Sequence, residues 1–326
     1  MKTAMGALRP SRPTGPLKRP PSKFRRELNK WVHATKWAAL QWIFRRDIAA
    51  IRSALGVEPF AAILAQYPDI PLKPVRPYLA ANLAHIHRSI AVVGHYTAAA
   101  RLLTDTALVE SHTCGHQLLA VSTVAGGVTV ELTGQDGLYR EAEWRLLLRL
   151  EGRPVIEMGL AIVNRPLLQL GEDGKILYIG ALKSMSIGVQ GLEDSRILTK
   201  AMEGLRPKTL LLLVAQTLAS SLKLDGLVAA SNAGHVFSRD YTLRHRITAD
   251  YDSFWAESGG TLLRRTMYAL PLMKAQRDPA DYKPNKRAQI RRRQRLEVEV
   301  VHNVGESVRP LLRERLGINS TDLTDR

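Results

Sequence analysis

The chain has 326 residues, of which 45% are apolar, so it can bury a globular core and is not a disordered protein. Lys and Arg number 47 against 30 Asp and Glu. The resulting formal charge of +17 indicates anionic partners such as nucleic acid, anionic lipid or an acidic carrier protein. The one cysteine, Cys114, excludes an intramolecular disulfide and a multi-cysteine zinc site, and it is typical of a protein from a reducing compartment.

Residues 1–22 are rich in proline and arginine, which predicts a disordered basic tail. No apolar segment follows this proline-broken tail, so we expect no secretory signal. The longest apolar run, Leu210–Ala215, is too short for a membrane span. We therefore expect a cytoplasmic protein that is soluble, or peripheral at the inner face of the inner membrane.

The segment from residue 23 to 106 has a helical period. Leu28, Trp31, Thr35 and Trp42 recur on one stripe, with basic residues over much of the remaining surface. The stripe fits an amphipathic helix docked on the core, and it also fits a membrane-surface helix with interfacial tryptophans. Histidines of the helix that follows lack the repeated spacing of metal ligands, so we predict no metal site.

The period changes from 3.6 to 2 after residue 107, which predicts an antiparallel meander of strands. Two helical stretches then lead to a buried strand that ends at Asn232. The fold class that we expect is α/β (α+β), with a helical N-terminal region followed by a mixed, mainly antiparallel sheet and flanking helices. The predicted meander covers residues 116–135, 139–152 and 153–164, as successive strands with Gly-containing turns, and residues 171–185, as a turn followed by another strand.

Two glycine-containing segments are candidates for phosphate binding. The helix predicted to begin at Pro207 has Arg206 and Lys208 beside the free N–H groups of its positive end, which suits a phosphate or pyrophosphate. The same two residues are also explained as solvated cations at a helix start. Together with a glycine-containing stretch before the crossover, the candidate cofactor-binding residues are Gly188, Gln190, Gly191, Gly204, Arg206 and Lys208.

A short aromatic helix and a Gly259–Gly260 turn follow the buried strand. This order of meander, crossover helix, strand, aromatic helix and strand resembles the GNAT acyltransferase superfamily. The resemblance implies a fourth strand that leads to a loop for the pantetheine pyrophosphate, and a fifth strand that splays from it to admit the acyl-donor arm. The usual Q/R-x-x-G-x-G/A loop is absent, and Gly188–Gly191 and Gly204–Lys208 are the nearest substitutes.

The same resemblance makes three residues candidates for the chemistry: Asn232, His235 and Tyr251. The amide would bind a thioester carbonyl, the imidazole would accept a proton from an amine or hydroxyl, and the phenol would protonate the leaving thiolate. The implied donors are coenzyme A or acyl carrier protein thioesters, or an aminoacyl-tRNA. Each residue also has a structural interpretation, as a cap at the strand end or as part of an aromatic core.

At family level the chain resembles the VirK/YbjX family. The stretches that carry this resemblance lie between about residues 24 and 300 and include "PYLAANLAHIHRSIAVVGHY", "TKAMEGLRPKTLLLLVA", "SNAGHVF", "YDSFWAESGG" and "KPNKRAQIRRRQRLEVEV". The resemblance implies a Gram-negative bacterial protein connected with virulence, the cell envelope and resistance to antimicrobial peptides. It implies no particular biochemical activity.

The segment Lys283–Arg295 has seven basic residues in thirteen, spread around a predicted helix. Such a segment fits an anionic membrane or an acidic partner, and a solvated tail is the alternative. Nucleic acid ranks lower, because no aromatic interleaving or known RNA-binding motif accompanies the charge. The residues that we assign to this surface are Lys286, Arg287, Arg291, Arg292, Arg293 and Arg295.

The leading hypothesis is an acyltransferase-like enzyme that transfers an acyl or aminoacyl group to an amine or hydroxyl. Its partners would be an acidic carrier protein, a tRNA-borne donor or an anionic lipid. The alternative is a non-catalytic peripheral membrane factor that supports the envelope. We divide the chain into a disordered tail, a helical region, a GNAT-like domain and a basic helical extension, at residues 1–22, 23–106, 107–275 and 276–326.

Overall fold

The computed structural model describes residues 23–134, 138–185, 189–247, 249–273, 276 and 278–314, and the chain forms two units, residues 1–43 and 44–326. Helix α1 (Lys23–Ile43) belongs to the first unit, and its Trp31 and Trp42 side chains are 70% and 67% exposed. The Thr35 hydroxyl donates to the carbonyl oxygens of Trp31 and Val32 (2.9 and 3.1 Å). The helix backbone therefore satisfies the Thr35 hydroxyl, which lies between the two tryptophans on their stripe.

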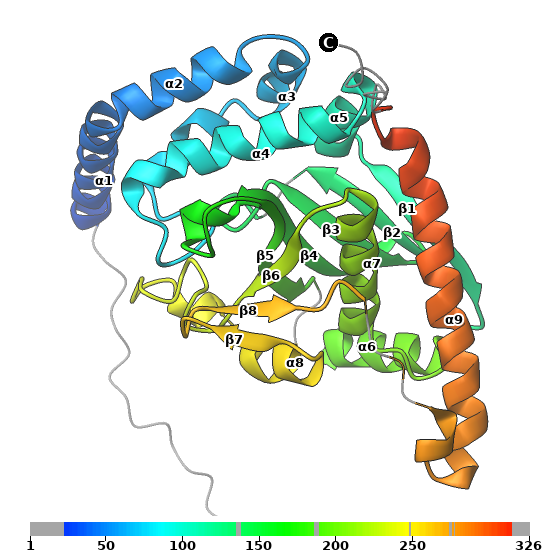
Figure 1. Cartoon of the computed structure of the whole chain (residues 1–326). Coiled ribbons are helices and arrows are strands. Elements are labelled where there is room, and N and C mark those ends of the chain that lie inside the picture. Colours follow the sequence, from blue (N-terminus) through cyan, green and yellow to red (C-terminus); the bar gives the residue numbers. More distant parts are fainter. Residues whose placement is uncertain are drawn as a thin grey trace, which may run out of the picture. The chain divides into compact units, whose positions relative to one another are not determined.

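Eight strands of the second unit form one sheet in the order β1-β2-β3-β4-β5-β6-β8-β7 (Figure 1). The first five strands are an antiparallel meander, β6 is parallel to β5, and β8 is antiparallel to both β6 and β7. The predicted mixed, mainly antiparallel sheet is confirmed. The strands are β1 (His116–Thr123), β2 (Gly126–Gly134), β3 (Trp144–Leu150), β4 (Arg153–Asn164), β5 (Lys175–Ser184), β6 (Gly226–Ala230), β7 (Thr261–Leu263) and β8 (Met267–Leu270).

Helices precede and flank this sheet, as the sequence predicts. In the second unit, α7 contacts β3 to β6, α9 runs along α7 and β1, α4 contacts β4, and α5 contacts β2 (Figure 1). The 3-10 helix η1 (Ile70–Val75) packs against α2 and α4. The helices are α2 (Arg45–Leu55), α3 (Phe60–Gln66), α4 (Arg88–Leu102), α5 (Asp105–His112), α6 (Val189–Ala201), α7 (Pro207–Ser221), α8 (Tyr251–Glu257) and α9 (Pro284–Val308).

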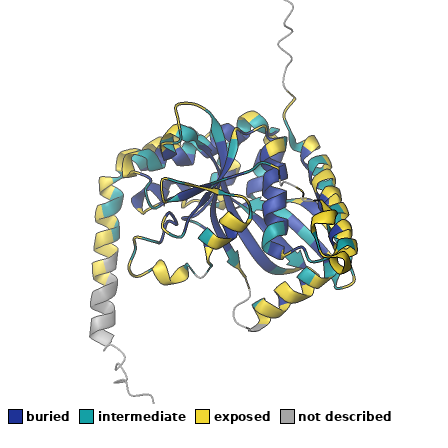
Figure 2. Cartoon of the chain, turned by 60° about the horizontal axis from the view of Figure 1, so that its bottom comes forward, coloured by how far each residue is buried: buried dark blue, intermediate teal, exposed yellow. Residues whose placement is uncertain are grey.

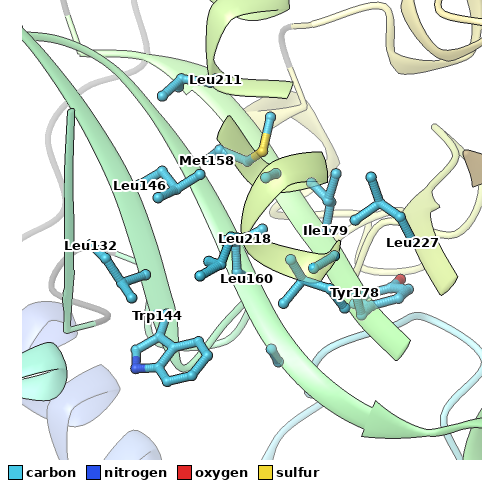
Figure 3. Packing of buried hydrophobic residues seen from close by; sticks show 14 of the residues in the cluster. Leu132, Trp144, Leu146, Met158, Leu160, Tyr178, Ile179, Leu211, Leu218 and Leu227 are labelled. Atoms are coloured by element: carbon cyan, nitrogen blue, oxygen red, sulfur yellow. The ribbon is translucent and has the colours of Figure 1, made fainter. Parts of the chain in front are cut away.

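One part of the core lies between the sheet and α7, and the same cluster extends to buried residues of α2 to α5. Every residue from Leu210 to Ala219 is buried, because the helix is covered by the sheet and by α9. Leu211 and Leu218 of α7 gather with Leu146, Met158 and Leu160 of the sheet (Figure 3). Burial is concentrated in the strands and in the helix beside them, and exposed residues dominate the outer helices (Figure 2).

A buried polar cluster ties η1 and α4 to the start of β3. The Glu143 carboxylate accepts hydrogen bonds from Lys73 Nζ (2.7 Å), from the Tyr96 hydroxyl (2.7 Å) and from the Tyr78 hydroxyl. Lys73 also donates to the Ala142 carbonyl at 3.0 Å. Since a buried carboxylate is costly unless it is paired and hydrogen-bonded, this cluster fixes how the N-terminal helices meet the sheet.

Beside it, two buried histidines form a hydrogen-bonded relay. The Ile162 N–H donates to His95 Nδ1 (3.0 Å), the two Nε2 atoms are 3.0 Å apart, and His112 Nδ1 lies 2.8 Å from the Leu108 carbonyl oxygen. This pattern is satisfied when His95 carries its proton on Nε2 and His112 on Nδ1. An additional proton on either ring would place two N–H groups against each other, so the relay requires both rings to be neutral.

We predict that the free energy of unfolding decreases as the pH falls below about 6.5. Burial lowers the pKa of His112 to about 3 and that of His95 well below its usual value, so the unfolded chain binds protons that the folded chain excludes. Each ring then contributes a slope of up to about 1.4 kcal/mol per pH unit, down to the folded pKa. Urea unfolding at pH 7 and pH 5 measures this loss.

The His112→Gln variant should show a smaller loss between the two pH values, whatever its stability at pH 7. The exposed His302 of α9 offers the matched control, because His302→Gln should retain the slope of the wild type. Equal slopes for the His112 variant and the wild type would contradict the neutral relay.

Candidate functional site

The sheet opens at the carboxyl end of its parallel pair. Pairing between β5 and β6 ends at Ile179 and Ala229, but β5 continues to Ser184. The chain turns away after β6 because Ser231 N–H donates to the Thr266 carbonyl and Gly234 lies against the same residue. A Cβ atom at Gly234 would come within 1.7 Å of the Thr266 oxygen. Part of the β5 edge is therefore left without a neighbouring strand.

Tyr251, the first residue of α8, occupies this edge. Its hydroxyl accepts a hydrogen bond from the Leu182 N–H (3.1 Å) and donates to the Leu182 carbonyl (3.1 Å). One side chain thus replaces the missing strand at that residue. Burial raises the pKa of Tyr251 to about 12, so the phenol is protonated at neutral pH.

Asn232 holds α8 in position. Its Oδ1 accepts the Tyr251 N–H (3.0 Å), and its own backbone N–H donates to the Asp252 carboxylate (3.0 Å). The Trp255 indole donates to the Ala230 carbonyl at 2.8 Å, which fixes the helix beneath the end of β6. The side-chain oxygen of Asn232 is therefore engaged in positioning Tyr251.

A cavity of about 270 Å³ lies beside this opening. Its wall brings together the end of β5, the segment before β3, the segment after β6 and the start of α8. The close approach of the first two requires Gly180, because a Cβ atom there would lie 2.0 Å from the Glu141 carbonyl oxygen. The lining residues are Arg76, Tyr139, Arg140, Glu141, Ala181, Lys183, His235, Phe237, Arg246 and Tyr251.

His235 is buried against Tyr251, with ring centroids 5.5 Å apart and an interplanar angle of 21°. Its Nδ1 accepts the Phe237 N–H at 3.2 Å. Burial, and then the nearby Arg140 and Lys183, lower the pKa of His235 to about 4. The ring is neutral at pH 7, and the Nδ1 hydrogen bond assigns its proton to Nε2, which makes that nitrogen a hydrogen-bond donor.

Glu141 is the one carboxylate in the cavity wall. It is only 6% exposed, and burial raises its pKa while Lys183 lowers it. One of its oxygens accepts the Arg140 backbone N–H at 3.2 Å. A buried carboxylate with a raised pKa, placed in a cleft, is a candidate proton acceptor.

The structure brings His235 and Tyr251 together in one cavity and places Asn232 behind them. Sequence reasoning missed Arg140, Glu141 and Lys183, because it assigned "YREAEWRLLLRLEG" and the end of β5 only to strands. The available signal was a charged pair, Arg140 and Glu141, directly before a strongly apolar strand. Because Arg140 and Glu141 are far from His235 in the sequence, the sequence did not indicate that they line the same cavity.

The predicted phosphate-binding residues are distributed over separate places. Gly204 and Arg206 line a second cavity of about 780 Å³ between α7, α8 and α9, and Arg206 forms an ion pair with Glu257 (3.2 Å). Lys208 Nζ lies 6.0 Å from the centre of the Phe254 ring. Gln190 donates to Asp194 (2.9 Å) from α6, which also contains Gly191. Gly188 lies outside the described residues, and phosphate binding stays a prediction.

The basic C-terminal segment does not present one uniform face. Arg287 donates to the carbonyls of Tyr282 and Ala280, and Arg292 forms an ion pair with Glu203 at 3.0 Å. Arg293 lines the larger cavity. The remaining members of the predicted surface, Lys286, Arg291 and Arg295, are exposed.

The described part of the chain contains no group of three or more His, Cys, Asp or Glu side chains arranged to hold a metal ion. Within those same residues, none of the helices combines the length and the apolar composition that a membrane span needs. Cys114, the single cysteine, is exposed.

We predict that Tyr251→Phe lowers the free energy of unfolding by about 1–3 kcal/mol, since it leaves the buried Leu182 N–H and carbonyl without partners. Urea denaturation checks this. The exposed Tyr241 provides the control, because Tyr241→Phe removes a hydroxyl at the surface and should have little effect. Equal stabilities of the two variants would show that the hydroxyl does not close the β5 edge.

The comparisons with known proteins place these features in a family. A family model described as "Protein of unknown function (DUF535)" matches residues 26–305. The chain is also similar to a protein of Escherichia coli (strain K12) described as "Uncharacterized protein YbjX", with 30% identity over 243 residues, which are 71% of this chain and 69% of that protein. No solved structure matches the chain.

Proposed function

The chain belongs to the VirK/YbjX family, DUF535, and on that premise we propose that it is an acyltransferase-like enzyme with its reaction centre in the cavity beside the β5 edge. The observation that carries the proposal is the opening between β5 and β6, with Glu141, His235 and Tyr251 beside it. The order of elements supports the GNAT resemblance: a meander, a helical crossover to a parallel strand, a short helix and two antiparallel strands.

The side chains supply the groups that acyl transfer needs. The acceptor nitrogen or oxygen attacks the acyl carbonyl carbon, and the Glu141 carboxylate accepts the proton that the acceptor loses. The bond to the acceptor forms, and the carbon–sulfur bond of the thioester breaks. The His235 Nε2–H donates a hydrogen bond to the oxyanion of the tetrahedral intermediate, and the Tyr251 hydroxyl protonates the leaving thiolate.

The donor would lie along the opened edge of β5. Peptide-like amides of a pantetheine arm pair with a strand edge as another strand would, and Leu182 offers its N–H and carbonyl there. Tyr251 makes both of these hydrogen bonds, so a donor that binds at Leu182 has to exchange with the phenol. The exchange brings the hydroxyl beside the thioester sulfur. Coenzyme A and acyl carrier protein remain the proposed thioester carriers. With an aminoacyl-tRNA donor the ester carbon–oxygen bond would break instead, and the Tyr251 hydroxyl would protonate the leaving ribose oxygen.

We predict that Glu141→Gln lowers the acyl-transfer rate by about 10²–10⁴-fold, the usual contribution of a positioned proton acceptor, and leaves the fold intact. The assay incubates the protein with acetyl- and palmitoyl-coenzyme A or acyl carrier protein, together with a panel of amines and alcohols, and detects products by mass spectrometry. Release of the donor's thiol, detected with a thiol-reactive dye, is a second readout. It is measured in a Cys114→Ser background, because the exposed Cys114 thiol would itself react with the dye.

The exposed Glu172 is the matched control, and Glu172→Gln should transfer at the wild-type rate. If Glu141→Gln retains full activity, Glu141 is not the proton acceptor. If no donor and acceptor pair gives a product with the wild type, the acyltransferase proposal fails.

A second candidate function, attachment to an anionic membrane surface, rests on α1. Trp31 and Trp42 are eleven residues apart and therefore share one face of the helix, and Val32 and Ile43 beside that stripe are 55% and 59% exposed. Residues 1–43 contain ten Lys and Arg against one Glu. Exposed apolar side chains on a helix with adjacent cations are the composition of an interfacial helix.

We predict that the full-length protein binds vesicles of phosphatidylcholine with 30–40% phosphatidylglycerol (about a third anionic lipid), and binds pure phosphatidylcholine at least about tenfold more weakly, because each cation near an anionic leaflet adds about 1 kcal/mol. Binding should blue-shift tryptophan fluorescence, since Trp144 and Trp255 are already fully buried and do not contribute a change.

The double variant Trp31→Ser/Trp42→Ser should lose most of this binding, while Trp37→Phe, on another face of α1, should retain it. Added salt should weaken the binding of the wild type. Equal binding by the two variants, or binding that is insensitive to lipid charge, would contradict attachment through α1.

A further inference from the structure

The cavity wall carries a surplus of positive charge. Arg76, Arg140, Lys183 and Arg246 contribute four cations, and Glu141 is the single carboxylate among the lining residues. Arg76 and Arg246 lie close enough to Arg140 to lower its pKa by charge repulsion, in addition to the larger effect of burial. Three guanidinium groups therefore converge on one part of a small cavity.

Arg140 is the most buried of these cations. Its side chain is only 9% exposed, its Nε donates to the Pro77 carbonyl (2.9 Å), and its guanidinium lies 4.8 Å from the centre of the Phe237 ring. Its Nη2 is buried and makes no hydrogen bond with the described residues. A buried guanidinium with an unused donor is unfavourable unless an anion accompanies it.

The acidic groups near the cavity are engaged elsewhere or do not contact the Arg140 guanidinium. Glu157 forms ion pairs with Lys183 (2.8 Å) and Arg145 (3.3 Å), so its charge is shared between two cations. Asp240 and Glu141 raise the pKa of Arg140, but no ion pair joins either to its guanidinium within the described ranges. Arg76 and Arg246 are exposed at the edge of the cavity, where a ligand can reach them.

We infer that the cavity binds a small molecule through an oxyanion, a phosphate or carboxylate, held by Arg140 with Arg76 and Arg246. Guanidinium groups suit oxyanions because their donors match two oxygen atoms at once. A volume of about 270 Å³ accommodates a metabolite or a lipid headgroup and excludes a folded polymer. The inference rests on the proposed function, in which this molecule is the acyl acceptor, with its amine or hydroxyl toward Glu141.

The test is titration of the full-length protein with inorganic phosphate and, separately, with acetate, at constant ionic strength kept by chloride. Ligand-observed and protein NMR give the dissociation constant, and the melting temperature reports stabilisation by binding. One of the two anions should bind with saturation and raise the melting temperature. Tighter binding of phosphate identifies a phosphorylated acceptor, and tighter binding of acetate identifies a carboxylate acceptor.

Arg140→Gln should weaken the binding at least about tenfold, and Arg140→Lys should retain part of it, because the charge remains without the planar pair of donors. Arg244→Gln is the matched control. Arg244 is an exposed arginine of the segment after β6 that stacks on Tyr241 at 4.6 Å, outside the cavity, and its variant should bind like the wild type.

Absence of saturable binding by both anions, or equal binding by Arg140→Gln and the wild type, would overturn the inference. These outcomes are separable from failure of the proposed reaction. Saturable, Arg140-dependent binding in a protein that transfers no acyl group would retain the oxyanion site and remove the enzyme. Acyl transfer to uncharged acceptors that is unaffected by Arg140→Gln would retain the enzyme proposal and reject the oxyanion site.

Discussion

The hydroxyl of Tyr251, hydrogen-bonded to both backbone groups of Leu182, is the contact on which the arrangement of the site depends. A sheet whose strands separate within the core leaves N–H and carbonyl groups unpaired, and such groups are costly when they are buried. A single side chain from α8 satisfies them here. The opening can therefore exist in a stable fold, and its position fixes the position of α8.

The connections around α8 follow from this constraint. Asn232 accepts the Tyr251 N–H, Asp252 accepts the Asn232 N–H, and Trp255 donates to Ala230. These contacts join the end of β6 to α8. They therefore fix the distance over which the Tyr251 phenol crosses the opening between β6 and β5. His235 stacks on the same phenol, so the position of Tyr251 also determines where the imidazole lies in the cavity wall. The side chains of the proposed reaction centre are thus supported by regular strands and by a short, well-anchored helix.

Sequence periodicity was sufficient to predict the meander, the crossover and the strand after it, because each element has a distinct hydrophobic period. The GNAT resemblance, and not the periodicity, made His235 and Tyr251 candidates, and the structure places both in the wall of one cavity. Periodicity could not predict that the Glu141 backbone packs against the end of β5. That contact is possible only because residue 180 is a glycine, which lets two segments distant in sequence come close together. Nor could it show that the side-chain oxygen of Asn232 is used as a cap, because that depends on the angle at which α8 enters.

The charged run near the C-terminus shows a related limit. A count of basic residues from Lys283 to Arg295 treats them as equivalent, but side-chain partners separate them. Arg287 and Arg292 contribute to local structure, and Lys286 and Arg291 are exposed. By contrast, the first 43 residues combine dense positive charge with exposed apolar side chains on one helix face. Charge density alone does not locate a binding surface, and the exposure of apolar neighbours is the more selective criterion.

The positive wall of the cavity also affects the nucleophile of the proposed acyl transfer. An amine attacks an acyl carbon only in its neutral form, and a free ammonium group loses its proton with a pKa well above 7. Burial, with smaller contributions from Arg140 and Lys183, already lowers the pKa of His235 to about 4. The same field would lower the pKa of an ammonium group beside them, because like charges disfavour the protonated form. An oxyanion on the acceptor would bind the arginines and offset their repulsion of the acceptor's ammonium group. The amine at the other end of the same molecule would lie toward Glu141, where it has to lose its proton. The surplus of cations thereby favours an acceptor that carries a negative group and a nucleophile together over a simple amine.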